Sequence, residues 1–315
     1  MRRVLTRLAW FLGSLLLASF LIFAATNALP GDIANFLLGT NARPEEVAAL
    51  RERLGLNRPF LVRYLEWLAG VVVGDFGTSQ ITGRPVTDMI LPRLEVSAWL
   101  VGLATIGSLL IALPVGAYAA LRRRHPDGVA VSAVSQFGLA VPSFWAGIWL
   151  VVLFAVQLRW FPAGGYVSYW DSVGDWTLHL VLPVGALSIV QASVISRYVR
   201  SAVIDVLHTD YFRTARAIGW SRIGALWRHG LRNISISLLT VIGLQVTTLL
   251  VGAIIIEQVF ALPGLGSRLL LAVTQRDLVI VQGIVLVLVW AVLLINFLVD
   301  VAYQFLDPRL KRVAR

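Results

Sequence analysis

Long apolar stretches alternate with polar segments along this chain, and six of the stretches contain no Asp, Glu, Lys or Arg. A helix needs about 20 apolar residues to cross the hydrocarbon core of a bilayer, and each of the six meets that length. The pattern therefore predicts an all-α, polytopic membrane protein with six transmembrane helices. The predicted spans run from Leu8 to Leu29, Val96 to Leu121, Gly128 to Leu158, Trp176 to Ser196, Asn233 to Ile256, and Leu278 to Val299.

Two apolar segments near the N-terminus need separate interpretation. The first span follows Met1-Arg2-Arg3, as a signal peptide would, but it is long for a signal sequence and Thr26-Asn27-Ala28 makes a poor cleavage site. We therefore expect a retained signal-anchor helix. The stretch from Leu65 to Val73 is too short to span and carries Glu66, so we expect it in the membrane interface or packed on the spans.

Basic residues fall mostly on one side of the six predicted spans. Of the 27 Lys and Arg residues, 17 lie in the N-terminal segment, the second and fourth loops and the C-terminal segment, whereas three lie in the third and fifth loops. Because cytoplasmic loops are enriched in Lys and Arg, both termini and the fourth loop are predicted to be cytoplasmic. Residues 1–29 then hold the N-terminus and first span, 30–95 an extracytoplasmic segment, 96–304 five further spans with a cytoplasmic loop at 205–232, and 305–315 a cytoplasmic tail.

The external segment contains one predicted helix. Arg43-Pro44-Glu45-Glu46 is followed by Val47, Leu50 and Leu54, which is helical spacing with acidic side chains in the first turn, where they favour the helix dipole. This segment could receive a soluble partner outside the membrane, or it could cap the outer mouth of a pore.

Composition agrees with a lipid environment and excludes several kinds of chemistry. Only 14% of the residues are charged, against about 25% in soluble domains. The absence of cysteine excludes disulfides, thiolate metal sites and thiol catalysis. Lysine occurs once, at Lys311, without the glycine-rich sequence of a nucleotide-binding P-loop. The net charge of +10 is explained by cytoplasmic loops, so we do not expect nucleic-acid binding.

The fourth loop predicts a helix, a glycine turn and a second helix. Residues Asp210 to Ile218 are helix formers, Gly219 suits a position just after a helix where φ is positive, and Ser221 suits an N-cap. Arg213 and Arg216 are three residues apart and share one helix face. The loop could press into a groove of a partner protein, or it could be a solvated basic loop near anionic lipid head groups.

The predicted spans contain proline and small residues. Pro114, Pro142 and Pro183 are expected to kink helices because proline lacks the backbone N–H. Gly102, Ala104 and Gly107 allow helices to approach closely. Such kinks could serve as hinges or as static packing geometry.

Blocks of residues in six places resemble one family of membrane proteins. Tyr211 to Gly219 is similar to the EAA-type coupling motif of binding-protein-dependent ABC importer permeases, in the version of the dipeptide/oligopeptide family, and the chain is closest to the B-type subunit of that family. The sequence departs from the family pattern at Ile218, Gly230 and Ser237. The other blocks of the resemblance include Gly31, Asp32, Gly74, Asp75, Gly77, Glu257, Pro263, Gly264, Arg276, Asp277, Asp300, Asp307 and Pro308.

The resemblance implies a type I ABC importer permease that moves di- or oligopeptides into a prokaryotic cell across the cytoplasmic (inner) membrane. It implies a homologous second permease, two ATPase subunits that hold ATP and magnesium, and an extracytoplasmic solute-binding protein, with no cofactor in this chain. Related permeases carry glutathione, nickel complexes or haem, and the sequence does not separate these substrates. The residues that the resemblance assigns to ATPase coupling are Asp210, Tyr211, Arg213, Thr214, Ala215, Arg216, Ala217 and Gly219.

Two other classes of protein are alternatives to an importer permease. An ion-coupled secondary transporter places ionisable groups near the middle of the bilayer, whereas Glu257, Asp300 and His179 lie near predicted span ends. An intramembrane enzyme needs a nucleophile–base pair, paired acids or a metal, and the spans contain no recognisable motif of this kind. We therefore expect a permease subunit without catalytic activity of its own.

Overall fold

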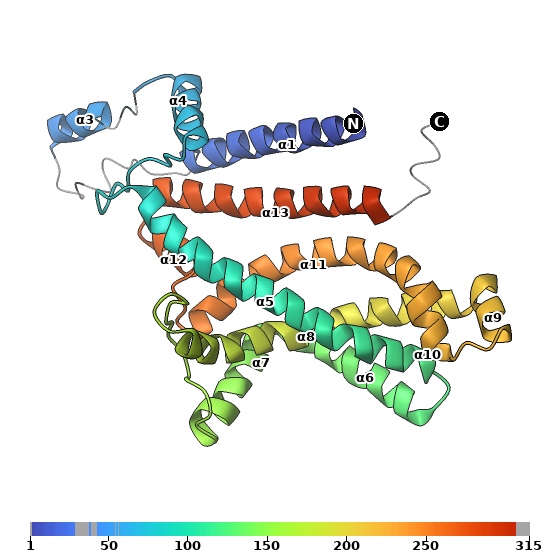
Figure 1. Cartoon of the computed structure of the whole chain (residues 1–315). Helices are drawn as coiled ribbons and strands as arrows, with labels where there is room; N and C mark the ends of the chain where they lie inside the picture. Colours follow the sequence, from blue (N-terminus) through green and yellow to red (C-terminus); the bar gives the residue numbers. More distant parts are fainter. Residues whose placement is uncertain (1, 29–37, 39–42, 54, 56, 307–315) are drawn as a thin grey trace. The chain divides into compact units, whose positions relative to one another are not determined.

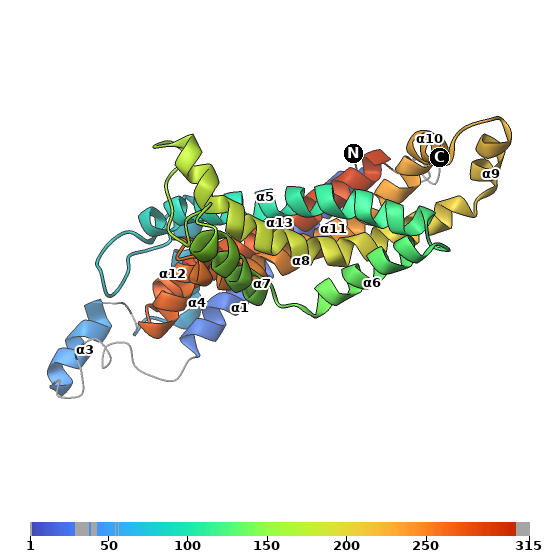
Figure 2. The same cartoon turned by 90° about the horizontal axis from the view of Figure 1, so that it is seen from below.

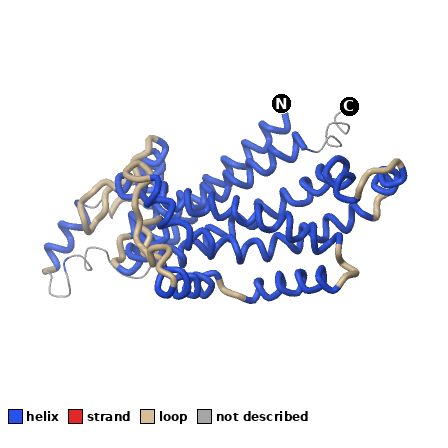
Figure 3. The backbone as a smooth tube through the Cα atoms, turned by 60° about the horizontal axis from the view of Figure 1, so that its bottom comes forward, coloured by secondary structure: helices blue, strands red, loops and turns tan. Residues whose placement is uncertain are grey.

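The computed structural model describes residues 2–28, 38, 43–53, 55 and 57–306, and within these ranges the chain is helical, with one isolated β-bridge between Thr78 and Pro85 (Figure 3). The helices divide between two compact units. The first comprises residues 1–94 and 268–293, and the second comprises residues 95–267 and 294–315. The all-α prediction is confirmed for the described residues.

In the first unit, an aromatic cluster packs a short helix onto a long one. Helix α1 (Arg2–Asn27) meets α4 (Phe60–Val72) through Phe20 and Phe23, whose rings lie 5.4 and 5.7 Å from the ring of Tyr64. The Tyr64 hydroxyl also shares a hydrogen bond of 2.9 Å with Ser19. The apolar stretch at 65–73 therefore packs on a span, as predicted. Helix α3 (Pro44–Arg53) forms at the predicted place, with Glu45 and Glu46 in its first turn.

The same unit contains α12 (Leu265–Thr274), which continues from the second unit, and the first part of α13 (Leu278–Leu306), which lies beside α1 in Figure 1. A buried hydrogen bond of 2.5 Å runs from the Gln282 side-chain amide to the Thr26 hydroxyl, between α13 and α1. In lipid an unpaired polar group is costly, so this pair fixes how the two spans face each other.

The second unit is built around α8 (Val173–Leu207), which contacts α6 (Pro126–Ala140), α7 (Ser143–Leu150) and α11 (Leu231–Val259) (Figures 1 and 2). Helix α5 (Val86–Leu121) starts in the first unit and contributes Leu100 and Ala104 to the core of the second, against Leu187 and Ile256. In the middle of the spans, the Gln191 amide donates to the side-chain oxygen of Gln245 at 2.7 Å and to its backbone oxygen at 3.1 Å.

The predicted third span is not one helix, and this prediction needs correction. It consists of α6 (Pro126–Ala140) and a second helix made of α7 (Ser143–Leu150) and the π-helical segment η1 (Val151–Gln157), bent from α6 by 102°. The cause is Pro142, which offers no N–H to continue the helix and holds the preceding Val141 in an extended conformation, with φ −88° and ψ 117°. Five single helices are long and apolar enough to span, and this broken pair makes the sixth candidate.

The other two prolines do not break their helices. Pro114 lies within α5 and Pro183 within α8, and both helices continue past them. Of the small residues, Ala104 is buried and Gly107 lies against Ser188 of α8, as expected, whereas a side chain at Gly102 would meet no other atom within 4 Å.

Gly116 lies where α5 approaches the backbone of α8 closely, and a valine there is expected to separate the two helices. A Cβ at Gly116 would lie 2.5 Å from the Ser196 carbonyl oxygen and 2.6 Å from the Val199 Cβ, so backbone must move. Such overpacking typically costs about 1–3 kcal/mol. Thermal unfolding of purified Gly116→Val in detergent should occur at a clearly lower temperature. Gly102→Val, in the same helix with open space around it, is the matched control and should unfold near the wild-type temperature. Equal unfolding temperatures for the two variants would contradict this packing argument.

Candidate functional site

The predicted helix–turn–helix in the fourth loop is present. Helix α9 (Asp210–Ala217) has Ile218 as its C-cap residue, and Gly219 follows with φ +97°. The Gly219 N–H donates to the Arg216 carbonyl and the Trp220 N–H donates to the Ala215 carbonyl, each at 3.2 Å. These two bonds form a Schellman motif, which requires a positive φ at the glycine position. The position predicted for Gly219 is therefore confirmed by its geometry.

The second helix starts where the sequence predicts. The Ser221 hydroxyl accepts a hydrogen bond of 3.0 Å from the Gly224 N–H, which caps α10 (Arg222–Ala225). The helix then passes through a π-helical turn, η2 (Leu226–Gly230), into α11. The loop is therefore continuous with a span on its C-terminal side, and α8 leads into it on the other side.

Helix α9 has two different faces. Phe212 and Ala215 are buried, and both belong to a core that also contains Val199 of α8 and Ile234 of α11. Arg213 and Arg216, which their spacing places on one face of the helix, are exposed. A hydrogen bond of 2.9 Å from the Asn233 amide to the Tyr211 hydroxyl ties α9 to α11. This short helix is thus fixed to the ends of two spans while its polar face stays open.

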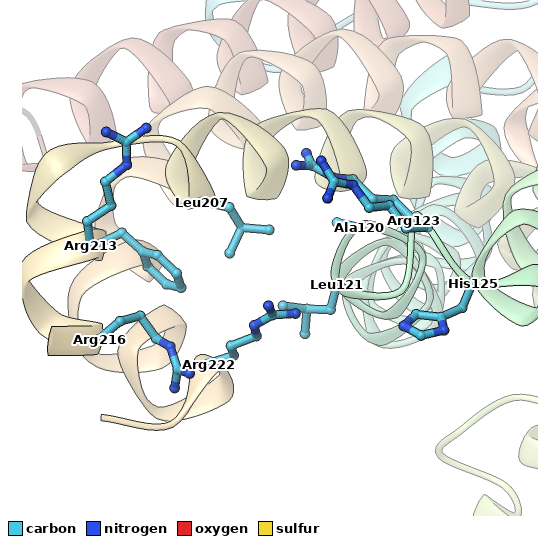
Figure 4. A pocket seen from close by; sticks show the side chains of 10 residues that line it. Ala120, Leu121, Arg123, His125, Leu207, Arg213, Arg216 and Arg222 are labelled. Carbon is cyan, nitrogen blue, oxygen red and sulfur yellow. The ribbon is translucent and has the colours of Figure 1, made fainter. Parts of the chain in front are cut away.

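A pocket of about 520 Å³ lies next to α9 (Figure 4). It is bordered by the turn between α5 and α6, by the end of α8, and by α9 and α10. Five arginines and one histidine contribute to its walls, and none of its lining residues is acidic. The lining residues are Ala120, Leu121, Arg123, Arg124, His125, Leu207, Phe212, Arg213, Arg216 and Arg222.

The turn between α5 and α6 is held by an ion pair. Arg122 approaches the Asp127 carboxylate at 2.7 Å, and the Tyr118 hydroxyl donates to the same oxygen at 2.6 Å. The hydrogen bond to Asp127 raises the pKa of the Arg122 guanidinium above its ordinary value. Asp127 pairs with Arg122, and the described ion pairs do not include Arg123 or Arg124. Arg123 instead approaches the His208 ring nitrogen at 3.1 Å.

Two other blocks of the resemblance form buried caps for helices. Glu257 is 1% exposed, and its carboxylate accepts hydrogen bonds from the Ser97 hydroxyl at 2.5 Å and the Ser267 N–H at 2.9 Å. Ser97 also accepts a bond of 2.9 Å from the Leu265 N–H. A carboxylate at the first turn of a helix favours the helix dipole, so Glu257 and Ser97 together cap α12. Any side chain at Gly264 would clash with the Glu257 carboxylate.

The second cap lies in the first unit. The buried Asp277 precedes α13 and accepts a hydrogen bond of 2.5 Å from the Ser79 hydroxyl. Ser79 is positioned by a turn in which the Gly77 N–H donates to the Asp75 side chain at 2.8 Å, and both Gly74 and Gly77 adopt φ +86°. These residues of the resemblance therefore connect the turn at 74–79 to the start of α13.

The remaining predicted residues are scattered. Thr214 donates to the Asp210 carbonyl at 3.0 Å, Asp210 pairs with Arg213 at 3.5 Å, and Ala217 is exposed. Arg276 adopts φ +56° beside Asp277, Asp300 is exposed on α13, and Pro263 lies in the exposed turn before Gly264. His179 contacts the Asp175 carbonyl at 2.7 Å. Gly31, Asp32, Asp307 and Pro308 lie outside the described residues.

Sequence reasoning missed the partners of these groups. Ser79 and Ser97 are ordinary serines in the sequence, and only the fold places them against Asp277 and Glu257. Arg123 and Arg124 were used to predict orientation, but nothing in the sequence indicates that they share a pocket with Arg222. Within the described ranges, no three His, Asp or Glu side chains gather closely enough to hold a metal ion.

Comparisons with known proteins cover almost the whole chain. Residues 112–312 match the family described as binding-protein-dependent transport system inner membrane component, and residues 1–98 match the N-terminal region of such membrane components. A protein of Brucella abortus, named for a peptide transport system permease, is 39% identical over 308 residues and covers 98% of each chain. The glutathione transport system permease protein of Salmonella choleraesuis is 38% identical over 309 residues, again 98% of each chain.

The fold also matches a solved transporter. An inward-facing structure of the MetNI methionine ABC transporter superposes with a TM-score of 0.58 at 17% identity, covering 70% of this chain and 96% of the matched chain. The helical architecture described above is therefore that of a type I ABC importer permease.

Proposed function

Because this chain belongs to the family of binding-protein-dependent transport system inner membrane components, we propose that it forms one half of the membrane path of an ATP-driven peptide importer. In this proposal α9 is the segment that transmits the motion of an ATPase subunit to the spans. Six span candidates and the permease relatives make the chain a multi-pass inner membrane protein. Both termini and α9 face the cytoplasm in the proposed orientation.

The observation that carries the proposal is the two-faced packing of α9. Its inner face, Phe212 and Ala215, shares a core with α8 and α11, so a displacement of α9 has to move the ends of those spans. Its outer face presents Arg213 and Arg216 to a partner. A helix of eight residues is too short to be stable alone, so its order comes from this attachment and from the turn at Gly219.

The relatives support a peptide as the substrate. One relative is named for a peptide transport system and another for glutathione transport, and glutathione is itself a short peptide. We propose a short peptide or peptide-like solute, delivered by a separate extracytoplasmic binding protein that selects it. The path would run between this chain and a homologous second permease.

ATP binding is assigned to other subunits. The single lysine, Lys311, has no P-loop sequence around it, and a P-loop lysine is needed to reach the β- and γ-phosphates. Two ATPase subunits that hold ATP and magnesium would dock on the cytoplasmic side, and this chain would contribute no catalytic group.

The proposal is tested by identifying the assembly and its energy source. The tagged chain, extracted from its native host in mild detergent, should recover a second six-span chain and P-loop ATPases by mass spectrometry. The complex in liposomes should take up a labelled dipeptide only when ATP is supplied on the side of the membrane that the ATPase subunits face. A proton uncoupler should leave the rate of uptake unchanged. Uptake that collapses with the proton gradient while ATP persists would instead support an ion-coupled carrier.

A further inference from the structure

The pocket beside α9 carries positive charge that is largely without a counter-charge among the residues that the structure describes. The lining residues include five arginines and no acid. Among the described carboxylates, Asp210 pairs with one of them: it lies 3.5 Å from Arg213, with both side chains largely exposed. Exposed pairs of this kind contribute little. Within the part of the chain that the structure describes, Arg124 and Arg222 make no ion pair. The described residues therefore leave positive charge at this site to which an anion can bind.

The pocket is also amphiphilic. Four of its lining residues are apolar, and they come from the final residues of α5 and α8 and from the buried face of α9: Ala120, Leu121, Leu207 and Phe212. In Figure 4, Leu121 and Leu207 lie between the arginines of the α5–α6 turn and those of α9 and α10. The apolar wall is thus continuous with spans, whereas the charged wall belongs to loops. A ligand that fills both parts is charged at one end and apolar at the other.

The anion favoured by the charged wall is a phosphate. The planar guanidinium group of arginine matches phosphate oxygens with paired hydrogen bonds. A cavity of about 520 Å³ is in the size range of small-ligand sites and is large enough for a phosphoglycerol head group.

We propose that this pocket binds the head group of an anionic phospholipid of the surrounding leaflet, with its phosphate among Arg123, Arg124 and Arg222. The phosphate would reduce the repulsion between the arginines of the α5–α6 turn and those of α9 and α10. It would thereby hold α9 at a defined distance from the spans. The lipid site itself follows from the pocket. Its regulatory consequence, that anionic lipid tunes coupling, rests on the proposed function.

Binding is tested on the purified full chain by native mass spectrometry, with phosphatidylglycerol or phosphatidylcholine added to the detergent micelles. The wild type is expected to retain phosphatidylglycerol preferentially. The double variant Arg124→Gln with Arg222→Gln should weaken this retention about 30-fold, which corresponds to about 2 kcal/mol for two basic residues. The double variant Arg197→Gln with Arg228→Gln is the control, because it removes the same charge from arginines that do not line this pocket. Their guanidinium groups lie over the rings of Tyr198 and Trp220 instead.

Three results would overturn the proposal. Equal retention of the two lipids by the wild type would exclude an anionic lipid site. Saturation by inorganic phosphate, with no preference between the lipids, would assign the pocket to a soluble anion. Unchanged lipid retention in Arg124→Gln with Arg222→Gln, with loss of co-purifying ATPase, would assign the arginines to a protein partner.

The proposed function has a separate readout. Lipid retention is measured without ATP, so a preference for phosphatidylglycerol stands even if no ATP-driven uptake is found. Conversely, ATP-driven uptake at the same rate in vesicles with and without phosphatidylglycerol, together with equal lipid retention, would remove the lipid site and leave the importer assignment intact.

Discussion

Replacing Gly219 with valine is expected to abolish ATP-driven uptake while the protein still assembles in the membrane. Gly219 adopts φ +97°, a conformation that costs a residue other than glycine about 1–3 kcal/mol and that is least accessible to a β-branched side chain. A Cβ at this position would meet no atom within 4 Å, so the effect is on the backbone alone. The Schellman turn would open and α9 would lose its fixed angle. Uptake of labelled peptide measures the loss of transport, and the amount of complex in the membrane measures assembly.

Two substitutions separate the turn from a general loss of stability. Gly219→Asn should retain much of the uptake, since asparagine tolerates positive φ better than other residues. Gly83→Val introduces comparable strain in the external segment, at φ +68° with open space around the glycine, and should leave uptake close to normal. Full transport by Gly219→Val would show that the geometry of this turn is not needed for coupling.

Replacing Glu257 with alanine is expected to have the largest effect on stability. The carboxylate accepts bonds from the Ser97 hydroxyl and the Ser267 N–H in a buried site, and its removal leaves those donors without an acceptor. Unsatisfied buried groups of this kind together cost about 2–5 kcal/mol. We expect Glu257→Ala to unfold in detergent at a much lower temperature, or to fail to accumulate as a monodisperse protein.

Glu257→Gln and Gly264→Ala test the reason for that loss. Glutamine keeps one acceptor but turns an amide donor toward the existing donors, so its stability should lie between those of wild type and Glu257→Ala. Gly264→Ala should be destabilising beside Glu257, because the new methyl group would clash with the carboxylate, and much less so when Glu257 is already alanine. If Glu257 were instead a proton relay, Glu257→Gln would leave unfolding unchanged and alter only the pH dependence of uptake.

Local signals in the sequence predicted α9 well. A helix that ends at a glycine and restarts at a serine is determined by backbone preferences within about ten residues, and the observed φ of Gly219 and the Ser221 cap agree with them. The same reasoning predicted a kink at Pro142. It could not predict a bend of 102°, because the size of the bend depends on what the two halves pack against.

Long-range partners could not be predicted in this way. Ser97 and Glu257 are 160 residues apart in sequence, and neither residue type by itself indicates a buried cap. The pocket beside α9 combines residues from three separate segments, 120–125, 207–216 and 222, whose proximity follows from helix packing. The distribution of basic residues predicts an orientation in the membrane, and this stays a prediction. It does not indicate which arginines share a pocket.

The paired glutamines at the centre of the spans have a consequence for how the protein can move. Gln191 binds both the side chain and the backbone of Gln245, and in the dry interior of a bilayer no solvent is available to exchange for these bonds. We therefore expect α8 and α11 to rotate as a single rigid body during a transport cycle. The hinge of the unit is then the break at Val141 and Pro142, where the backbone already lacks helical hydrogen bonds.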